Sequence, residues 1–239
     1  MKKLKIVTLN LWRYYDWPDR RRNVLEFIAK NNPDIIALQE VQLNKSFSEL
    51  SQAEDIAKSA GYKYHVFSPT MKKTDQIDLN GDFTQEAEHG LAIISKYPIT
   101  SSESYLLQKH PQDKEKRTVL FCDIQIQDTI LRLCNVHFSN RTIYSDLHIK
   151  ELMDVIKGKK HKPIILGDFN IYDLSPYKLN ILDGYKSSRD FSSYASYPKD
   201  DGSLDYVLLP DSYSFEKISC PAIYLSDHRP VIAEIISDI

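Results

Sequence analysis

The sequence predicts an α/β fold, in which strands and helices alternate along the chain. Apolar strand-like runs are separated by segments with helical periodicity, and no shift in composition divides them. A strand ending at Asn10, a helix and a strand ending at Glu40 form one unit. The same order recurs with a strand ending at His137, a helix and a strand ending at Asp168. Residues 34–41 are too apolar for a sheet with one face in water, which favours a covered sheet.

The first part of the chain gives clear start and stop signals. A helix is predicted over residues 18–30, because Pro18 stands near its start and Pro33 follows its end. A second helix is predicted over residues 46–60, where Gly61 ends it. Strands in this part are predicted at residues 5–11, 34–41, 62–67 and 90–95.

A long polar segment covers residues 68–89. It contains Asn80-Gly81-Asp82, a turn signal, so we predict a long loop with room for a short hairpin. Loops of this length are usually either functional or disordered. We therefore expect residues 68–89 to select the substrate.

The second part of the chain begins with an alternating pattern. Residues 117–127 and 129–138 predict a hairpin around a tight turn. Residues 143–156 predict a helix that Lys157-Gly158 closes. Further strands are predicted at residues 163–166, 204–209, 214–219 and 231–236.

The composition excludes several classes of protein. With 42% hydrophobic residues and a net charge of −2, the chain is neither disordered nor drawn onto nucleic acid by its overall charge. The three scattered cysteines favour a reducing compartment, and the sequence has neither a signal-peptide core nor an apolar run of transmembrane length. We expect a cytoplasmic monomer with a single domain over residues 1–239. The basic runs at residues 20–22 and 157–162 indicate solvated helix surfaces.

Oxygen-bearing side chains at strand ends suggest a metal site. Glu40 follows the apolar run 35–38, and a buried charge needs a cation or a network of donors. Asn10 and Asp227 supply further hard oxygen atoms, which suit Mg²⁺ or Mn²⁺. The alternative is that Glu40 forms an ion pair with an arginine or lysine.

A second group of polar residues suits proton transfer. His228 lies beside Asp227, and Asp205 begins a strand from which it could orient the imidazole for proton transfer near neutral pH. Asp168 and Asn170 stand two apart, so an extended backbone would point both to one side, the carboxylate holding water and the amide a phosphate oxygen. The alternatives are a structural histidine and a turn in which Asp168 and Asn170 cap their own backbone.

His137 and Arg117 are candidates for binding a phosphate. Arg117 could meet a phosphate with both guanidinium nitrogens, although a solvated arginine at a strand start is the alternative. His137 ends an alternating strand, where a hydrogen-bonded structural histidine is also common. The sequence has no glycine-rich phosphate loop and no Gly-x-Ser-x-Gly elbow, so it gives no support to P-loop or serine-hydrolase chemistry.

Taken in order, these motifs resemble those of the endonuclease/exonuclease/phosphatase superfamily, and the resemblance runs from the first strand to the last. It implies a four-layer α-β-β-α sandwich, with two mixed β-sheets packed face to face and helices outside. The motifs are Thr8-Leu9-Asn10, Leu38-Gln39-Glu40, Asn135-Val136-His137, Gly167-Asp168-Phe169-Asn170, Leu204-Asp205-Tyr206 and Ser226-Asp227-His228-Arg229-Pro230.

The resemblance also implies roles for individual residues. Glu40 would be the main Mg²⁺ ligand, with Asn10 and Asp227 close to it. Asp168 would orient or deprotonate the attacking water. In addition, Asn170 and His137 would contact the scissile phosphate, and Asp205 would orient His228 as a second proton-handling group.

The expected function is a Mg²⁺-dependent phosphoesterase that hydrolyses phosphodiester bonds by in-line attack of an activated water. A nuclease acting on DNA or RNA comes first. A histidine at position 137 is similar to the deoxyribonuclease, sphingomyelinase and general phosphodiesterase branches of the superfamily. One alternative is a phosphatase or phosphodiesterase of a small or lipid-linked phosphate, such as an inositol phosphate or sphingomyelin. Another is a non-catalytic binding module, against which the retention of every motif residue argues.

Overall fold

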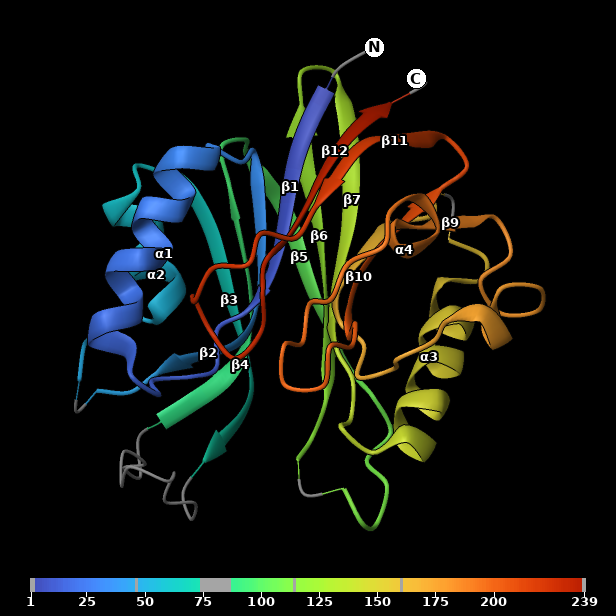
Figure 1. Cartoon of the computed structure of the whole chain (residues 1–239), viewed down its shortest axis with the longest axis horizontal. Helices are drawn as coiled ribbons and strands as arrows, with labels where there is room; N and C mark the ends of the chain where they lie inside the picture. The colour runs from blue at the N-terminus through green and yellow to red at the C-terminus, as the bar shows by residue number, and fades with distance from the viewer. Residues whose placement is uncertain (1–2, 46, 74–86, 114, 160, 238–239) are drawn as a thin grey trace.

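The structure is a computed structural model that describes residues 3–45, 47–73, 87–113, 115–159 and 161–237 (Figure 1). Over these residues the chain forms two six-stranded sheets. The first sheet has the strand order β11-β12-β1-β2-β4-β3 and the second the order β5-β6-β7-β8-β10-β9. The strands are β1 (Lys3–Asn10), β2 (Ile35–Leu43), β3 (Tyr64–Lys73), β4 (Ala87–Ser95), β5 (Ile99–Leu106), β6 (Thr118–Ile126), β7 (Thr129–His137), β8 (Ile164–Asp168), β9 (Tyr185–Ser187), β10 (Asp205–Pro210), β11 (Tyr213–Ser219) and β12 (Val231–Ser237).

Helices cover the outer faces of both sheets. Figure 1 shows α1 and α2 beside the first sheet and α3 beside the second. Together the four layers confirm the predicted α-β-β-α sandwich. The helices are α1 (Trp17–Asn31), α2 (Gln52–Ser59), α3 (Thr142–Ile156) and the short α4 (Ser188–Phe191), with a 3₁₀ turn at Ser175–Tyr177.

Alternation along the buried strands builds three apolar cores. In β2, Ile35 and Ala37 point between the two sheets, whereas Ile36 and Leu38 point toward α1 and α2. A third core lies between the second sheet and α3. Because both faces of β2 are covered, its sequence is apolar without alternating, as predicted.

The repeated strand–helix–strand order is present in the structure. Strands β1 and β2 pair in parallel, and α1 connects them along the chain. Strands β7 and β8 also pair in parallel, and α3 connects them. In each pair the last paired residues lie side by side, Asn10 beside Gln39 and His137 beside Asp168. The polar residues at these positions therefore meet at one edge of the sandwich.

Several predicted boundaries are wrong. Strands β3 and β4 pair up to Lys73 and Ala87, so both ends of the predicted 68–89 loop are strand. Residues 74–86, with Asn80-Gly81-Asp82 and most of the segment expected to select the substrate, lie outside the described residues. The helix predicted from residue 46 begins at Gln52, because the Ser51 hydroxyl caps it by accepting from the Glu54 backbone N–H at 3.1 Å.

Two further predictions concern the surface. Arg20 does not lie on a solvated helix face, because it is 0% exposed. By contrast, the described residues of the 157–162 run are exposed as predicted, although they follow α3 and do not lie on a helix. In the part of the chain that the structure describes, every helix is too short or too polar to cross a membrane.

Candidate active site

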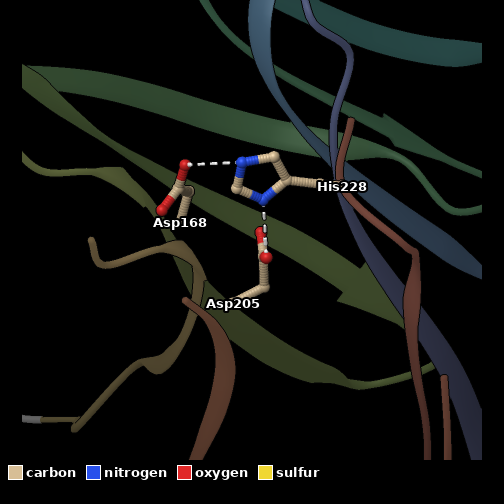
Figure 2. Close-up of side chains that lie close together, drawn as sticks. All are labelled: Asp168, Asp205 and His228. Atoms are coloured by element: carbon tan, nitrogen blue, oxygen red, sulfur yellow. Dashed lines mark hydrogen bonds and ion pairs between the residues drawn. The ribbon is translucent and has the colours of Figure 1, made fainter. Parts of the chain in front are cut away.

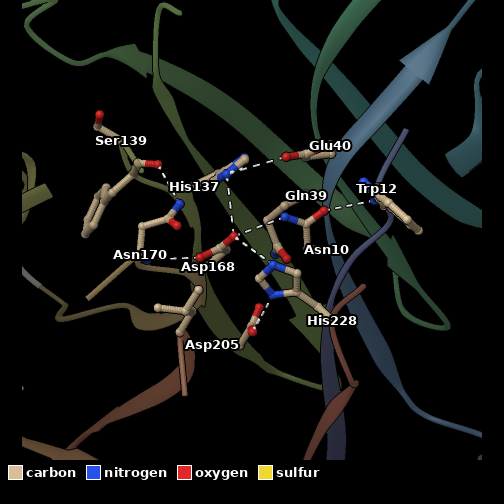
Figure 3. Close-up of polar contacts among 12 residues, drawn as sticks. Asn10, Trp12, Gln39, Glu40, His137, Ser139, Asp168, Asn170, Asp205 and His228 are labelled. Carbon is tan, nitrogen blue, oxygen red and sulfur yellow. Dashed lines mark hydrogen bonds and ion pairs between the residues drawn. The ribbon is translucent and has the colours of Figure 1, made fainter. Parts of the chain in front are cut away.

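One cleft of about 630 Å³ opens where the strand ends meet. Both sheets contribute to it, and Figure 3 shows the side chains pointing toward one another. Every predicted site residue lines the cleft except Asp205, which is fully buried behind His228. The predicted residues that line it are Asn10, Glu40, Arg117, His137, Asp168, Asn170, Asp227 and His228.

His228 lies between two carboxylates (Figure 2). Its Nδ1 is 2.8 Å from Asp205 Oδ2, and its Nε2 is 3.8 Å from Asp168 Oδ2. Burial would lower the pKa of His228, but Asp205 and Asp168 outweigh it and raise that pKa to about 10. Burial raises the pKa of Asp168 to about 7, with His228 opposing the rise. The arrangement joins a protonated imidazole to a carboxylate of raised basicity, which suits proton transfer.

The same three residues are also close enough to be considered as metal ligands. Their donor atoms lie within 4.8 Å of one another. The two carboxylates face opposite ring nitrogens of His228, however, and this arrangement suits an imidazole held between them for proton transfer. We therefore interpret Asp168, Asp205 and His228 as a proton-handling group.

Local backbone geometry aims Asp168 into the cleft. The preceding Gly167 has φ 142°, and a Cβ there would lie 2.1 Å from the Val136 carbonyl oxygen, so only glycine fits. The Asp168 side chain is then fixed by two donors. The Asn10 amide donates to Oδ2 at 3.0 Å, and the Asn170 backbone N–H donates to Oδ1 at 3.0 Å.

Asp168 and Asn170 are not in an extended segment. Asn170 has φ 52°, and its backbone N–H donates to the Asp168 side chain. This is the turn in which Asp168 caps the backbone, the alternative that the sequence left open. Both side chains nevertheless line the cleft. The Asn170 amide donates one hydrogen to the Phe138 carbonyl at 3.0 Å, which leaves its second hydrogen for another acceptor.

Glu40 leaves the regular strand at a bulge. The pairing of β2 with β4 shifts between Leu38 and Val41, and Glu40 has φ 52°, which turns its side chain into the cleft. Its Oε2 accepts from Arg13 Nε at 3.0 Å, so the ion-pair alternative is present in the structure. Burial would raise the pKa of Glu40, but the positive charges around it, that of Arg13 foremost, lower that pKa to about 2.

Arg117 fixes the protonation state of His137. Arg117 is 7% exposed, so the alternative of a solvated arginine is wrong. Its Nη1 donates to His137 Nε2 at 3.0 Å, and because a guanidinium has no acceptor, that ring nitrogen must be unprotonated. Burial and the charge of Arg117 accordingly lower the pKa of His137 well below its ordinary value.

Asn10 and Asp227 complete the set of predicted residues. Asn10 is engaged at both ends, because its Oδ1 accepts from the Trp12 backbone N–H at 2.9 Å while its amide holds Asp168. Asp227 accepts from the Ser226 hydroxyl at 3.0 Å. Burial raises the pKa of Asp227, and the negative charge of Glu40 adds to the rise. Two acidic groups thus face the same part of the cleft.

Sequence reasoning missed four charged residues in the cleft wall, Arg13, Asp113, Glu115 and Arg141, and two of them form an ion pair. Arg13 Nη2 donates to Glu115 Oε1 at 3.0 Å, and Glu115 Oε2 is 3.5 Å from Arg117 Nη2. Glu115 thus connects the two arginines. No pattern could have paired Arg13 with Glu115, because 102 positions separate them and both lie in loops.

Buried Arg20 was also missed, and it joins two loops of the site. Its Nη1 donates at 2.8 Å both to the Leu11 carbonyl, next to Asn10, and to the Leu225 carbonyl, near Asp227. Its Nε donates to the Tyr15 carbonyl at 2.7 Å. Arg20 therefore holds the loop after β1 against the loop before β12.

Comparison with known proteins gives one sequence family and one fold. Residues 7–228 match the sequence profile of the Endonuclease/Exonuclease/phosphatase family. An uncharacterized protein of Acanthamoeba polyphaga mimivirus is 23% identical over 266 residues, covering 96% of this chain and 98% of its own length.

Two solved structures have the same fold. An endonuclease/exonuclease/phosphatase from Beutenbergia cavernae has a TM-score of 0.81 at 17% identity, over 99% of this chain and 72% of its own. D. rerio TDP2 complexed with a single strand DNA product has a TM-score of 0.73 at 16% identity, over 99% of this chain and 100% of its own.

Proposed function

The chain belongs to the Endonuclease/Exonuclease/phosphatase family, and from this premise we propose that it is a Mg²⁺-dependent phosphodiesterase acting on nucleic acid. The cleft carries the proposal, because it brings the Asp168–His228–Asp205 group and the acidic pair Glu40 and Asp227 to one place. We further propose that residues 1–239 form one catalytic domain.

The chemistry of the donors fits a divalent cation. Glu40 raises the pKa of Asp227, which is the mutual repulsion that a cation between or beside them would relieve. Carboxylate and amide oxygens are the ligands that Mg²⁺ prefers, so Glu40 would hold the ion with Asp227 and Asn10 nearby, and Mn²⁺ could substitute. When bound, the ion would neutralise charge on the substrate phosphate.

The proton transfers can be assigned to residues of this chain. Asp168, held by Asn10 and Asn170 and raised in pKa, accepts the proton of the attacking water. The Nε2–H of His228 donates to the leaving oxygen, while Asp205 stabilises the imidazolium. In-line attack then needs only positioning and charge neutralisation.

Phosphate binding falls mainly to Arg117 and Asn170. Arg117 keeps further N–H groups beyond the one that it donates to His137, and Asn170 has a second amide hydrogen. With Nε2 accepting from Arg117, His137 positions that guanidinium.

Two observations favour nucleic acid over a small phosphate. Arg13, Arg117 and Arg141 line the cleft, as phosphate contacts along a strand would require. Tyr172, which is 54% exposed, and Tyr197 also line it and offer ring faces on which bases can stack. The similar D. rerio TDP2 was solved with a single strand DNA product, which is consistent with such a substrate.

A substrate panel with Mg²⁺ or with chelator tests the proposal. The panel contains plasmid, single-stranded DNA, RNA, sphingomyelin, an inositol phosphate and bis-nitrophenyl phosphate. We expect chelator-sensitive cleavage of a nucleic acid, and Asp168→Asn should lower kcat about 10²-fold or more. The matched control is Asp128→Asn, an exposed carboxylate at the turn between β6 and β7.

Each other outcome decides against part of the proposal. Cleavage of only a lipid or small phosphate would replace nucleic acid as the substrate. Near-native turnover of Asp168→Asn would remove Asp168 from the mechanism. The absence of any activity, together with no binding of Mg²⁺, would leave a binding module on the same fold.

A further inference from the structure

Arg13 lies in the cleft in a position that the surrounding residues build. Its backbone has φ 56°, a left-handed conformation that a non-glycine residue rarely adopts. The backbone is held there because the Arg13 carbonyl accepts from Gln52 Nε2 at 2.7 Å and from Arg20 Nη2 at 3.2 Å. The guanidinium is therefore delivered to the cleft by a fixed loop.

Two carboxylates hold the guanidinium of Arg13. Nε donates to Glu40 Oε2 and Nη2 donates to Glu115 Oε1, each at 3.0 Å. The side chains of Arg13, Glu40 and Glu115 are 25%, 16% and 12% exposed, so water screens these contacts only in part. Glu40 is also the residue proposed above as the main ligand of the divalent cation.

A cation on Glu40 would weaken the contact of Arg13 with Oε2 of that carboxylate. The cation and the guanidinium would share one carboxylate, and their positive charges repel each other in a partly buried site. Glu115 provides a second anchor that does not depend on Glu40. Released from Glu40, Arg13 would still be held at the wall of the cleft by Glu115, and its Nε–H could then donate to another acceptor.

We propose that Arg13 is a substrate-binding residue that pairs with Glu40 until a divalent cation displaces it, and that it then binds the substrate phosphate. The inference rests on the proposed function, because it requires Glu40 to be the metal ligand. According to this proposal, Arg13 weakens binding of the cation to the protein. Once the cation is bound, Arg13 strengthens binding of phosphate.

The test measures both affinities without relying on turnover. Mn²⁺ binding is followed by the EPR signal of the free ion, and binding of inorganic phosphate to the Mn²⁺-saturated protein is followed by calorimetry. Arg13→Gln should bind Mn²⁺ about tenfold more tightly and phosphate about tenfold more weakly than the wild type. A merely structural role of Arg13 would not strengthen binding of the metal.

Two comparison variants separate direct competition from a general change of charge. Arg117→Gln removes a charge from the same cleft without removing a contact to Glu40, so its gain in Mn²⁺ affinity should be smaller than that of Arg13→Gln. Arg22→Gln removes an exposed charge from α1 and should change neither affinity. The proposal is overturned if Arg13→Gln gains no more Mn²⁺ affinity than Arg117→Gln, or if its phosphate affinity is unchanged.

Glu40→Gln distinguishes failure of this inference from failure of the proposed function. If Glu40→Gln leaves Mn²⁺ binding of the protein unchanged, the proposed metal site is wrong. The proposed exchange, in which the cation displaces Arg13 from Glu40, is then wrong as well. If Glu40→Gln abolishes binding while Arg13→Gln has no effect, the metal site stands and only the exchange is refuted.

Discussion

His148 of α3 illustrates how one buried side chain connects two loops near the cleft. Its Nδ1 accepts from the Ser139 backbone N–H at 3.3 Å, so the ring proton is on Nε2, which donates to the Gln108 carbonyl at 3.2 Å. The bond from Ser139 requires an unprotonated Nδ1 and therefore the neutral imidazole, and burial lowers the pKa of His148. Ser139 lies next to Asn140, which lines the cleft. The bond from Ser139 to His148 therefore helps to fix the backbone at the rim of the cleft.

The lowered pKa of His148 predicts a pH-dependent stability. The unfolded chain binds a proton here below about pH 6.5, whereas folded His148 resists it, so its stabilisation is complete above that pH and is lost as the pH falls. His148→Gln can keep both hydrogen bonds without titrating. From pH 7 to pH 5 the difference in unfolding free energy should move in favour of the variant, by at most about 1.4 kcal/mol per pH unit.

Urea unfolding of both proteins at several pH values measures this difference. Titration of the carboxylates is common to the two proteins and cancels. A difference that stays constant between pH 7 and pH 5 would show that His148 titrates alike in the folded and unfolded chains.

The residues of the site were predictable to different degrees, for a physical reason. Glu40, Asp168 and His228 stand beside apolar strand runs, so a local pattern reveals them. Arg13 and Glu115 act through a contact between two loops, and no local pattern encodes such a contact. The sequence was therefore sufficient to identify these three residues, but identifying partners such as Arg13 required the three-dimensional structure.

At the scale of elements, α1 both covers the first sheet and anchors the site. Its buried residues include Trp17, Arg20, Val24, Phe27 and Ile28. These positions form one helical stripe, so the periodicity that identified the apolar face also contained the signal that Arg20 is buried. The neighbouring arginines masked that signal, because a run of basic residues usually lies in water.

Arg20→Met should therefore be costly. It would leave the carbonyls of Leu11, Tyr15 and Leu225 without their buried donor, which we expect to lower the unfolding free energy by about 2–4 kcal/mol. The freed loops adjoin Asn10 and carry Asp227, so Mn²⁺ binding should weaken as well. Urea unfolding and Mn²⁺ titration measure both effects, with Arg22→Met on the exposed face of α1 as control. Equal stability of the two variants would contradict the anchoring role.

Two edge strands, β5 and β9, were the elements that the sequence hid. All of β5 after Ile99 is exposed, so it has no apolar alternation and is formed by pairing with β6. In the same way, the outer parts of β3 and β4 continue as strand because they pair with each other. Central strands were predictable because they are buried on both faces, whereas edge strands depend on their neighbours.

At the scale of the whole molecule, each sheet carries half of the site. Asn10 and Glu40 belong to the first sheet, while His137, Asp168 and Asp205 belong to the second. Strand patterns predicted an α/β fold, but the face-to-face packing of the sheets followed only from the family resemblance. The site exists because the sheets are held in one relative position, and a buried amide between them contributes to that position.

Asn135 of β7 is this amide. It is 0% exposed, and its Nδ2 donates across the interface at 2.9 Å to both the Leu38 and Ala92 carbonyls of the first sheet. Its Oδ1 accepts from Gln39 Nε2 at 2.7 Å, one residue before Glu40. Asn135 thus ties the strand of His137 to the strand of Glu40.

Removing this connection should affect stability and metal binding together. Asn135→Ala leaves the Gln39 amide and two carbonyls with a missing partner inside the protein, which we expect to cost about 2–4 kcal/mol of unfolding free energy. Because Gln39 adjoins Glu40, Mn²⁺ affinity should fall even at temperatures where the variant is fully folded. Asn180→Ala, at an exposed position, is the matched control for urea unfolding and Mn²⁺ titration. If Asn135→Ala loses stability but binds Mn²⁺ like the control, the amide stabilises the sandwich without positioning the two halves of the site.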